Sequence, residues 1–233
     1  ADAAIGDKGL TPIALSANYL NAPDPAEIQL ATTIRRRGRQ VSLVDVELSQ
    51  HNRTAVTCTV TLGHADSKPP RHQEPGSLTD MPAEPPVGAI PVSSDHPLGQ
   101  IIHIGQGCDM RMDSTTTGFL DGQQGPPITR MWVRPFADDE INPATATLFA
   151  LMTADVSPPV IMHRGFFGWT PTVQLTAYLR RRPAAGWMRV IASSAVIGDT
   201  WFEEDHVVLD ATGQVVVQSR QLAMLPRVTW QPE

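Results

Sequence analysis

The chain has 233 residues, of which 41% are hydrophobic, and a net charge of −6. This length suits one large domain or two small ones with a buried core. The negative charge argues against a nucleic-acid partner and against docking on an anionic membrane.

No run of 18 apolar residues occurs, so no membrane insertion is expected. The two cysteines, Cys58 and Cys108, lack the spacing of a metal site or a disulfide scaffold. We therefore expect no bound metal and a cytoplasmic location. Two basic runs, "RRRGR" at 35–39 and "RRR" at 180–182, are interpreted either as solvated strand ends or as a coenzyme phosphate site.

The first half of the chain predicts β structure. The opening "ADAAIGDKG" is typical of the end of a helix followed by its glycine stop. Residues 13–63 then hold runs rich in Val, Ile, Thr and Leu, broken at 37–39 and 51–53 by residues that favour turns. This pattern predicts an antiparallel meander.

Residues 64–99 change in character, because they hold eight prolines and few large apolar side chains. We interpret them as an extended tether between two folded halves.

Residues 100–233 contain the clearest helix. Asn142 is a good N-cap, Pro143 suits the first helical position, and "SPP" at 157–159 ends the apolar run. Three strand-like runs follow, the second long enough for two strands, and "ATGQ" at 211–214 is predicted to be a hairpin turn.

The two halves repeat each other. "LSANYL" at 15–20 matches "LTAYL" at 175–179, and "VELSQHNRTAVTCTVTL" matches "VVLDATGQVVVQSRQLA". Each half therefore contains a unit of one helix and a meander. Because 70 residues separate Gly105 from Leu175 and only 14 precede Leu15, we hypothesise that this chain lacks the first unit's opening strand and most of its helix.

These segments resemble the double-hotdog acyl-CoA thioesterases of the type II class. The resemblance is carried by "RRRGRQVSLVDVELSQ", "NPATATLFALMTADVSPP", "PTVQLTAYLRRRP" and "QSRQLAMLPR". It implies an α+β fold of two hotdog units, each an antiparallel sheet wrapped around a central helix. The expected division is an incomplete N-terminal unit at 1–63, the connection at 64–99 and a C-terminal unit at 100–233.

The resemblance also implies an activity, namely hydrolysis of acyl-CoA to a fatty acid and free CoA. No cofactor is implied, since CoA belongs to the substrate, and the protein is expected to form a homo-oligomer. The family's water-holding residues correspond to Asp155, Thr172 and Gln221. The acyl chain length is not determined by the sequence.

The residues themselves support these assignments unequally. Asp155 follows Leu148, Leu151 and Met152 at helical spacing, which predicts a partly desolvated carboxylate on an apolar stripe. The alternative is a solvated Asp at the end of a helix.

Gln221 alternates with small and apolar residues of the last strand, as either a water-orienting or a structural amide. Thr172 alternates with Val173 and should face away from Leu175, so Thr170 and Thr176 are close rivals.

Further substrate contacts are assigned to Phe166, Phe167 and Trp169, as the lining of an acyl tunnel or as core packing, and to Arg180. Because the first unit carries Val60 at the position that matches Gln221, we expect one active site per chain, in the second unit.

Other activities fit the sequence less well. A hotdog hydratase would need a His/Asp or His/Glu pair in a recognisable motif, and "HRGFFG" at 163–168 does not supply it. We expect four histidines, at 51, 103, 163 and 206, to be surface or loop residues. No G-x-S-x-G motif indicates a serine nucleophile. The remaining alternative is a non-catalytic acyl-CoA-binding protein.

Overall fold

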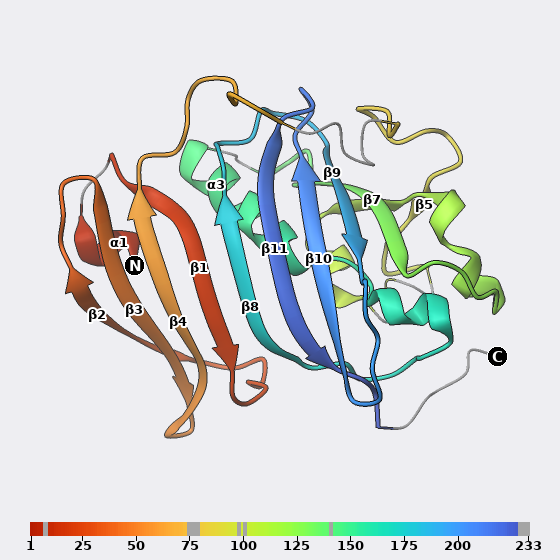
Figure 1. The fold of residues 1–233 in the computed structure, drawn as a ribbon, viewed down its shortest axis with the longest axis horizontal. Coiled ribbons are helices and arrows are strands. Elements are labelled where there is room, and N and C mark those ends of the chain that lie inside the picture. The colour runs from red at the N-terminus through yellow and green to blue at the C-terminus, as the bar shows by residue number, and fades with distance from the viewer. Residues whose placement is uncertain (7–8, 74–79, 97–98, 100–101, 140–141, 228–233) are drawn as a thin grey trace.

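The computed structural model describes residues 1–6, 9–73, 80–96, 99, 102–139 and 142–227. They form one antiparallel sheet of 11 strands in the order β2-β3-β4-β1-β8-β11-β10-β9-β7-β6-β5 (Figure 1). The strands are β1 (Thr11–Tyr19), β2 (Gln29–Arg36), β3 (Val41–Gln50), β4 (Arg53–Gly63), β5 (Ile90–Pro91), β6 (Asp109–Met112), β7 (Ile128–Arg134), β8 (Thr172–Leu179), β9 (Met188–Ser193), β10 (Trp201–Leu209) and β11 (Val215–Met224).

The two units meet at the centre of the sheet, where β1 pairs antiparallel with β8. The repeat seen in the sequence is confirmed by the strand register. Leu15 lies opposite Val60 in the first unit, and its counterpart Leu175 lies opposite Gln221 in the second. The predicted turn at 51–53 is confirmed, with His51 and Asn52 at φ angles of 51° and 59°.

The opening helix α1 (Asp2–Ile5) ends at Gly6, whose φ of 70° is the left-handed stop that the sequence predicts. Asn142 caps the longer helix α3 (Pro143–Met152) by accepting hydrogen bonds from the N–H groups of Ala144 and Thr145. Both helix ends therefore follow from local chemistry.

Helix α3 covers one face of the second unit's sheet, which we call the inner face (Figure 1). The apolar stripe predicted for this helix is confirmed in part, because Leu151 and Met152 pack against the main core, but the prediction is wrong for Leu148. Leu148 is 61% exposed, whereas Thr147, Ala150 and Ala154 are buried. Small side chains let the helix axis approach the sheet closely, so the bulky residues are displaced to the flank.

The Pro-rich connection is more than a tether, which corrects the sequence interpretation. Met81 is buried against Trp132 and Trp187, and the backbone carbonyl of Met81 accepts a hydrogen bond from Arg189. Val92 lies in the main core, next to strand β5. The segment is therefore attached to the second unit by the packing of Met81 and Val92 and by the hydrogen bond from Arg189.

Among the described residues, 143–164 is long and apolar enough to cross a membrane by composition. Half of its most apolar window is buried, and Ala150 and Ala154 belong to the main core. We therefore interpret this stretch as a core segment.

Candidate active site

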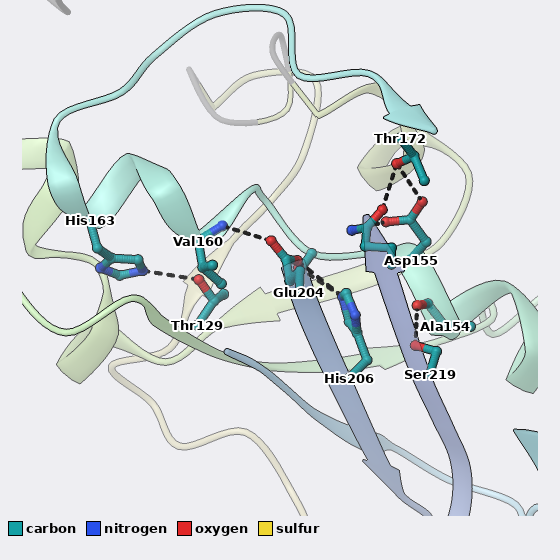
Figure 2. Close-up of polar contacts among 11 residues, drawn as sticks. Thr129, Ala154, Asp155, Val160, His163, Thr172, Glu204, His206 and Ser219 are labelled. Atoms are coloured by element: carbon teal, nitrogen blue, oxygen red, sulfur yellow. Dashed lines mark hydrogen bonds and ion pairs between the residues drawn. The ribbon is translucent and has the colours of Figure 1, made fainter. Parts of the chain in front are cut away.

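Asp155 lies in a short 3-10 turn (Thr153–Asp155) that continues α3. Its neighbour Ala154 is buried, and the carbonyl of Ala154 accepts a hydrogen bond of 2.6 Å from Ser219 Oγ on β11. This contact ties the end of the helix to the sheet at the residue before the carboxylate (Figure 2).

Gln221 lies on the inner face of β11, where it is buried. Its Nε2 donates a hydrogen bond of 2.9 Å to Asp155 Oδ1, and its Oε1 lies 2.5 Å from Thr172 Oγ1. Both ends of the amide are therefore engaged, which fixes its orientation.

Thr172 begins β8, and the structure corrects the side predicted for it. Thr172 lies opposite Ala223, and Gln174 lies opposite Leu222, so Val173 is an extra residue in the pairing. This register shift reverses the alternation and brings Thr172 to the inner face, which Leu175 and Gln221 share. A simple two-residue period could not have revealed it.

The side chains of Asp155, Thr172 and Gln221, which we call the trio, form a closed ring of contacts. Thr172 Oγ1 is 3.3 Å from Asp155 Oδ2 and closer to Gln221, while Gln221 Nε2 reaches the other Asp155 oxygen. The single hydroxyl proton of Thr172 serves one acceptor at a time, and the shorter contact is to Gln221. Oδ2 is thus the carboxylate oxygen with the weaker contact. The rival Thr176 contacts Ser16 and Gln174 instead.

Burial raises the pKa of the Asp155 carboxyl above its ordinary value, and the hydrogen bonds from Gln221 and Thr172 oppose this shift. The desolvation effect is the larger one, because the pKa remains raised. A carboxylate of this kind is a stronger base than one in water.

Among the described residues of the first unit, the positions that match Gln221 and Thr172 lack polar side chains. Val60 matches Gln221, and Pro12 matches Thr172 at a register shift of the same kind. Neither side chain can hold a water by hydrogen bonds.

The predicted substrate contacts have different environments. Phe166 packs on a small cluster that contains Phe202 and Ala223, and Ala223 is the residue opposite Thr172. Phe167 belongs to the main core, whereas Trp169 is 73% exposed. Phe166 therefore packs in the same cluster as a strand neighbour of Thr172.

Arg180 is not brought to the trio. It follows the opposite end of β8 from Thr172 and lines a cavity of about 720 Å³ with Thr176 and Tyr178 on the outer face. A second cavity, of about 570 Å³, lies beside the first turn of α3 and is lined by Arg134 and Arg182. No trio member lines either cavity.

Two histidines were wrongly assigned to the surface. His163 is buried, its Nε2 lies 3.0 Å from Thr129 Oγ1, and burial lowers its pKa to about 4. His206 is buried beside Glu204 on β10. The expected exposure of His51 and His103 is confirmed.

Ser157, Glu204 and His206 form a buried polar cluster that was not predicted from the sequence. The pattern "EEDH" at 203–206 contained a usable signal, because alternation puts Glu204 and His206 on the same face as the buried Phe202 and Val208. Among the described residues, no three His, Cys, Asp or Glu side chains are grouped as metal ligands.

Comparison with known proteins agrees with this fold. The family model of the acyl-CoA thioesterase N-terminal domain matches residues 1–63, and that of the C-terminal domain matches residues 75–225. The chain belongs to the acyl-CoA thioesterase family. It is therefore a thioesterase, and its general activity is thioester hydrolysis.

Similar proteins support the assignment. An uncharacterized protein of Mycobacterium tuberculosis (strain H37Rv) is 44% identical over 229 residues, which cover 92% of this chain and 76% of that protein. A Thermobifida fusca protein provisionally assigned as a thioesterase II has a structure with a TM-score of 0.78 and 28% identity, over 93% of this chain and 79% of that one.

A more distant structure shares the fold. An acyl-CoA thioesterase II of Mycobacterium marinum has a TM-score of 0.65 at 18% identity, over 97% of this chain and 83% of that one.

Proposed function

We propose that Asp155, Thr172 and Gln221 hold and activate the water that hydrolyses an acyl-CoA thioester. The observation that carries this proposal is the closed ring of contacts among three polar side chains on the inner face, where Gln221 is buried. Buried polar groups need such partners, and a ring that includes a raised-pKa carboxylate suits general base catalysis.

The reaction proceeds by direct attack. Gln221 and Thr172 orient the water, Asp155 Oδ2 accepts one of its protons, and the water oxygen bonds to the thioester carbonyl carbon. The C–S bond then breaks, the fatty acid is released, and the CoA thiolate takes the proton back from Asp155. No covalent enzyme intermediate is needed, because a thiolate is a good leaving group.

The substrate contacts predicted from the sequence are kept as part of this proposal. We assign Phe166 to the acyl group next to the scissile bond, with Phe167 and Trp169 further along the chain. Arg180 stays a prediction of the sequence, since it lies at the far end of β8. The three-part division of the chain, the cytoplasmic location, the homo-oligomer and a role in fatty acid metabolism also remain proposals.

The experiment is thiol release from acyl-CoAs of different chain lengths, comparing the wild-type protein with Asp155→Asn. The matched control is Asp205→Asn, because Asp205 is an outer-face carboxylate of β10 paired with Arg220. We expect Asp155→Asn to lose turnover by a factor on the order of 10² or more while it still binds acyl-CoA.

If Asp155→Asn keeps its turnover, the proposed role of the trio in water activation is wrong. Binding of acyl-CoA without turnover in the wild type would favour the non-catalytic binding protein. The hydratase alternative is weakened by burial, because both side chains of the Glu204/His206 pair are at most 1% exposed.

A further inference from the structure

The buried cluster of Ser157, Glu204 and His206 has no part in the proposed water activation. Glu204 and His206 are each 1% exposed. Ser157 Oγ donates a hydrogen bond of 2.7 Å to Glu204 Oε1 and lies 3.0 Å from His206 Nε2, and the two ionisable side chains are 3.4 Å apart. A core made only of apolar side chains would avoid the cost of burying these groups.

The cluster is attached to the segment that carries Asp155. Ser157 is two residues beyond Asp155 in the chain, and the N–H of Val160 donates a hydrogen bond of 3.0 Å to Glu204 Oε2. Figure 2 shows Glu204 and His206 on one strand, with the 154–160 segment passing over them. The carboxyl group of Glu204 therefore holds this segment at two points after Asp155.

A third attachment precedes Asp155. Ser219 Oγ holds the carbonyl of Ala154, and Ser219 lies directly opposite His206 in the register of β10 and β11. In the same register Glu204 lies opposite Gln221. The cluster and the trio are thus adjacent on the inner face, and side chains of two strands fix the segment on both sides of the carboxylate.

A buried atom of His206 also lacks a partner. Among the described residues, His206 Nδ1 has no hydrogen-bond partner. The imidazole thus uses Nε2 alone, toward Ser157. An arrangement that tolerates such an unsatisfied group indicates that the Ser157 contact has a purpose beyond stability.

We propose that Glu204, bridged by Ser157 to His206, is a positioning residue that holds the Asp155 carboxylate against Gln221 and Thr172. This inference rests on the proposed function of the trio. Small displacements matter here, because an error of about 1 Å in a catalytic group can cost about 10² in rate.

The test begins with Ser157→Ala, which removes the bridge and keeps both ionisable groups. We expect kcat to fall about tenfold or more with KM changed less than about twofold, since Ser157 is not among the residues assigned to substrate contact. Ser194→Ala is the matched control, because Ser194 makes an exposed contact with the carbonyl of Val196.

Conservative rescue separates positioning from packing. Glu204→Gln keeps an oxygen for the N–H of Val160 and puts an amide group that can donate to Ser157 Oγ where Glu204 Oε1 accepted from it, so its kcat should stay within about threefold of the wild type. Glu204→Leu keeps the bulk and should lose kcat as Ser157→Ala does. If Glu204→Leu and Glu204→Gln have the same kcat and the same melting temperature, the proposal is overturned.

A readout independent of turnover is the titration of Asp155 followed by carboxyl ¹³C NMR. If Ser157→Ala loosens the contacts with Gln221 and Thr172, which lower the pKa of Asp155, this carboxyl will titrate at higher pH. An unchanged titration in Ser157→Ala would contradict positioning. Loss of the water-activation role would instead appear as an active Asp155→Asn variant.

Discussion

Ser16 and Thr176 lie directly opposite each other on β1 and β8, with their hydroxyl oxygens 3.3 Å apart. They are also the equivalent residues of "LSANYL" and "LTAYL". The two units are therefore related by a local two-fold axis that passes between these residues. The two similar sequence segments, 15–20 and 175–179, each form one side of the junction between the units.

A double-mutant cycle tests this junction. Ser16→Ala and Thr176→Val should each destabilise the protein slightly, with a coupling free energy of about 0.5–1 kcal/mol, as for cross-strand hydroxyl pairs. Urea unfolding at one pH gives the four stabilities. Simple additivity would mean that the hydroxyl contact contributes nothing to joining the units.

The asymmetry between the units gives a reciprocal pair of substitutions. Gln221→Val should lower kcat by about 10²-fold, because one support of the water is lost. Val60→Gln puts an amide in the buried equivalent position and should cost about 1–3 kcal/mol of stability with kcat unchanged. Steady-state kinetics and urea unfolding of both variants measure this, and a large loss of kcat in Val60→Gln would indicate a second site.

The register shift in β8 brings Thr172, and not Thr176, into contact with Asp155 and Gln221, so the proposed water site predicts different effects for the two threonines. Thr172→Val should reduce kcat and move the acid limb of the pH–rate profile to higher pH, because the hydroxyl lowers the pKa of Asp155. Activity should fall as the pH drops through this pKa, since the base must be ionised. Thr176→Val is the control and should leave the acid limb in place.

Glu204 makes stability depend on pH between its ordinary pKa of 4.5 and its raised pKa of about 8. Burial raises its pKa from 4.5 to about 8, so the folded state holds a proton there that the unfolded state has released. This contribution is complete below pH 4.5 and is lost as the pH rises to about 8. Between pH 6.5 and 8 the unfolding free energy should fall by roughly 1–2 kcal/mol.

Two other ionisable groups near Glu204 also affect how the unfolding free energy depends on pH, so each needs to be considered in this experiment. His206, whose pKa burial lowers from 6.5 to about 4, is neutral in the folded state across this range but half protonated in the unfolded state at pH 6.5, so it adds a smaller slope of the opposite sign that fades as the pH rises. The raised pKa of Asp155 acts with the same sign as Glu204, so Asp155→Asn is measured in parallel. Urea unfolding across this range should be flatter for Glu204→Gln, and an equal slope would exclude Glu204 as the source.

The orientation of α3 is tested by two opposite changes. Ala150 is fully buried against the sheet, so Ala150→Leu should overpack the core and cost about 1–3 kcal/mol. Leu148 is 61% exposed, and Leu148→Ala should change stability by about 0.5 kcal/mol or less. Thermal unfolding distinguishes this orientation from the stripe predicted by the sequence, which would reverse the two results.

Local patterns by themselves determined the elements of this protein. The turn at 51–53, the cap at Asn142 and the glycine stop at Gly6 depend on neighbouring residues alone, so they could be predicted. The internal repeat likewise predicted the match of Val60 with Gln221, which the register confirms.

Only the tertiary structure decided which side chains meet. The extra residue at Val173 turns Thr172 toward Asp155, and the small residues of α3 turn Leu148 outward. The Glu204 cluster lies next to the trio because β10 and β11 pair in one register. A shift of one residue reverses every side chain of a strand, and that choice depends on contacts between residues far apart in the chain.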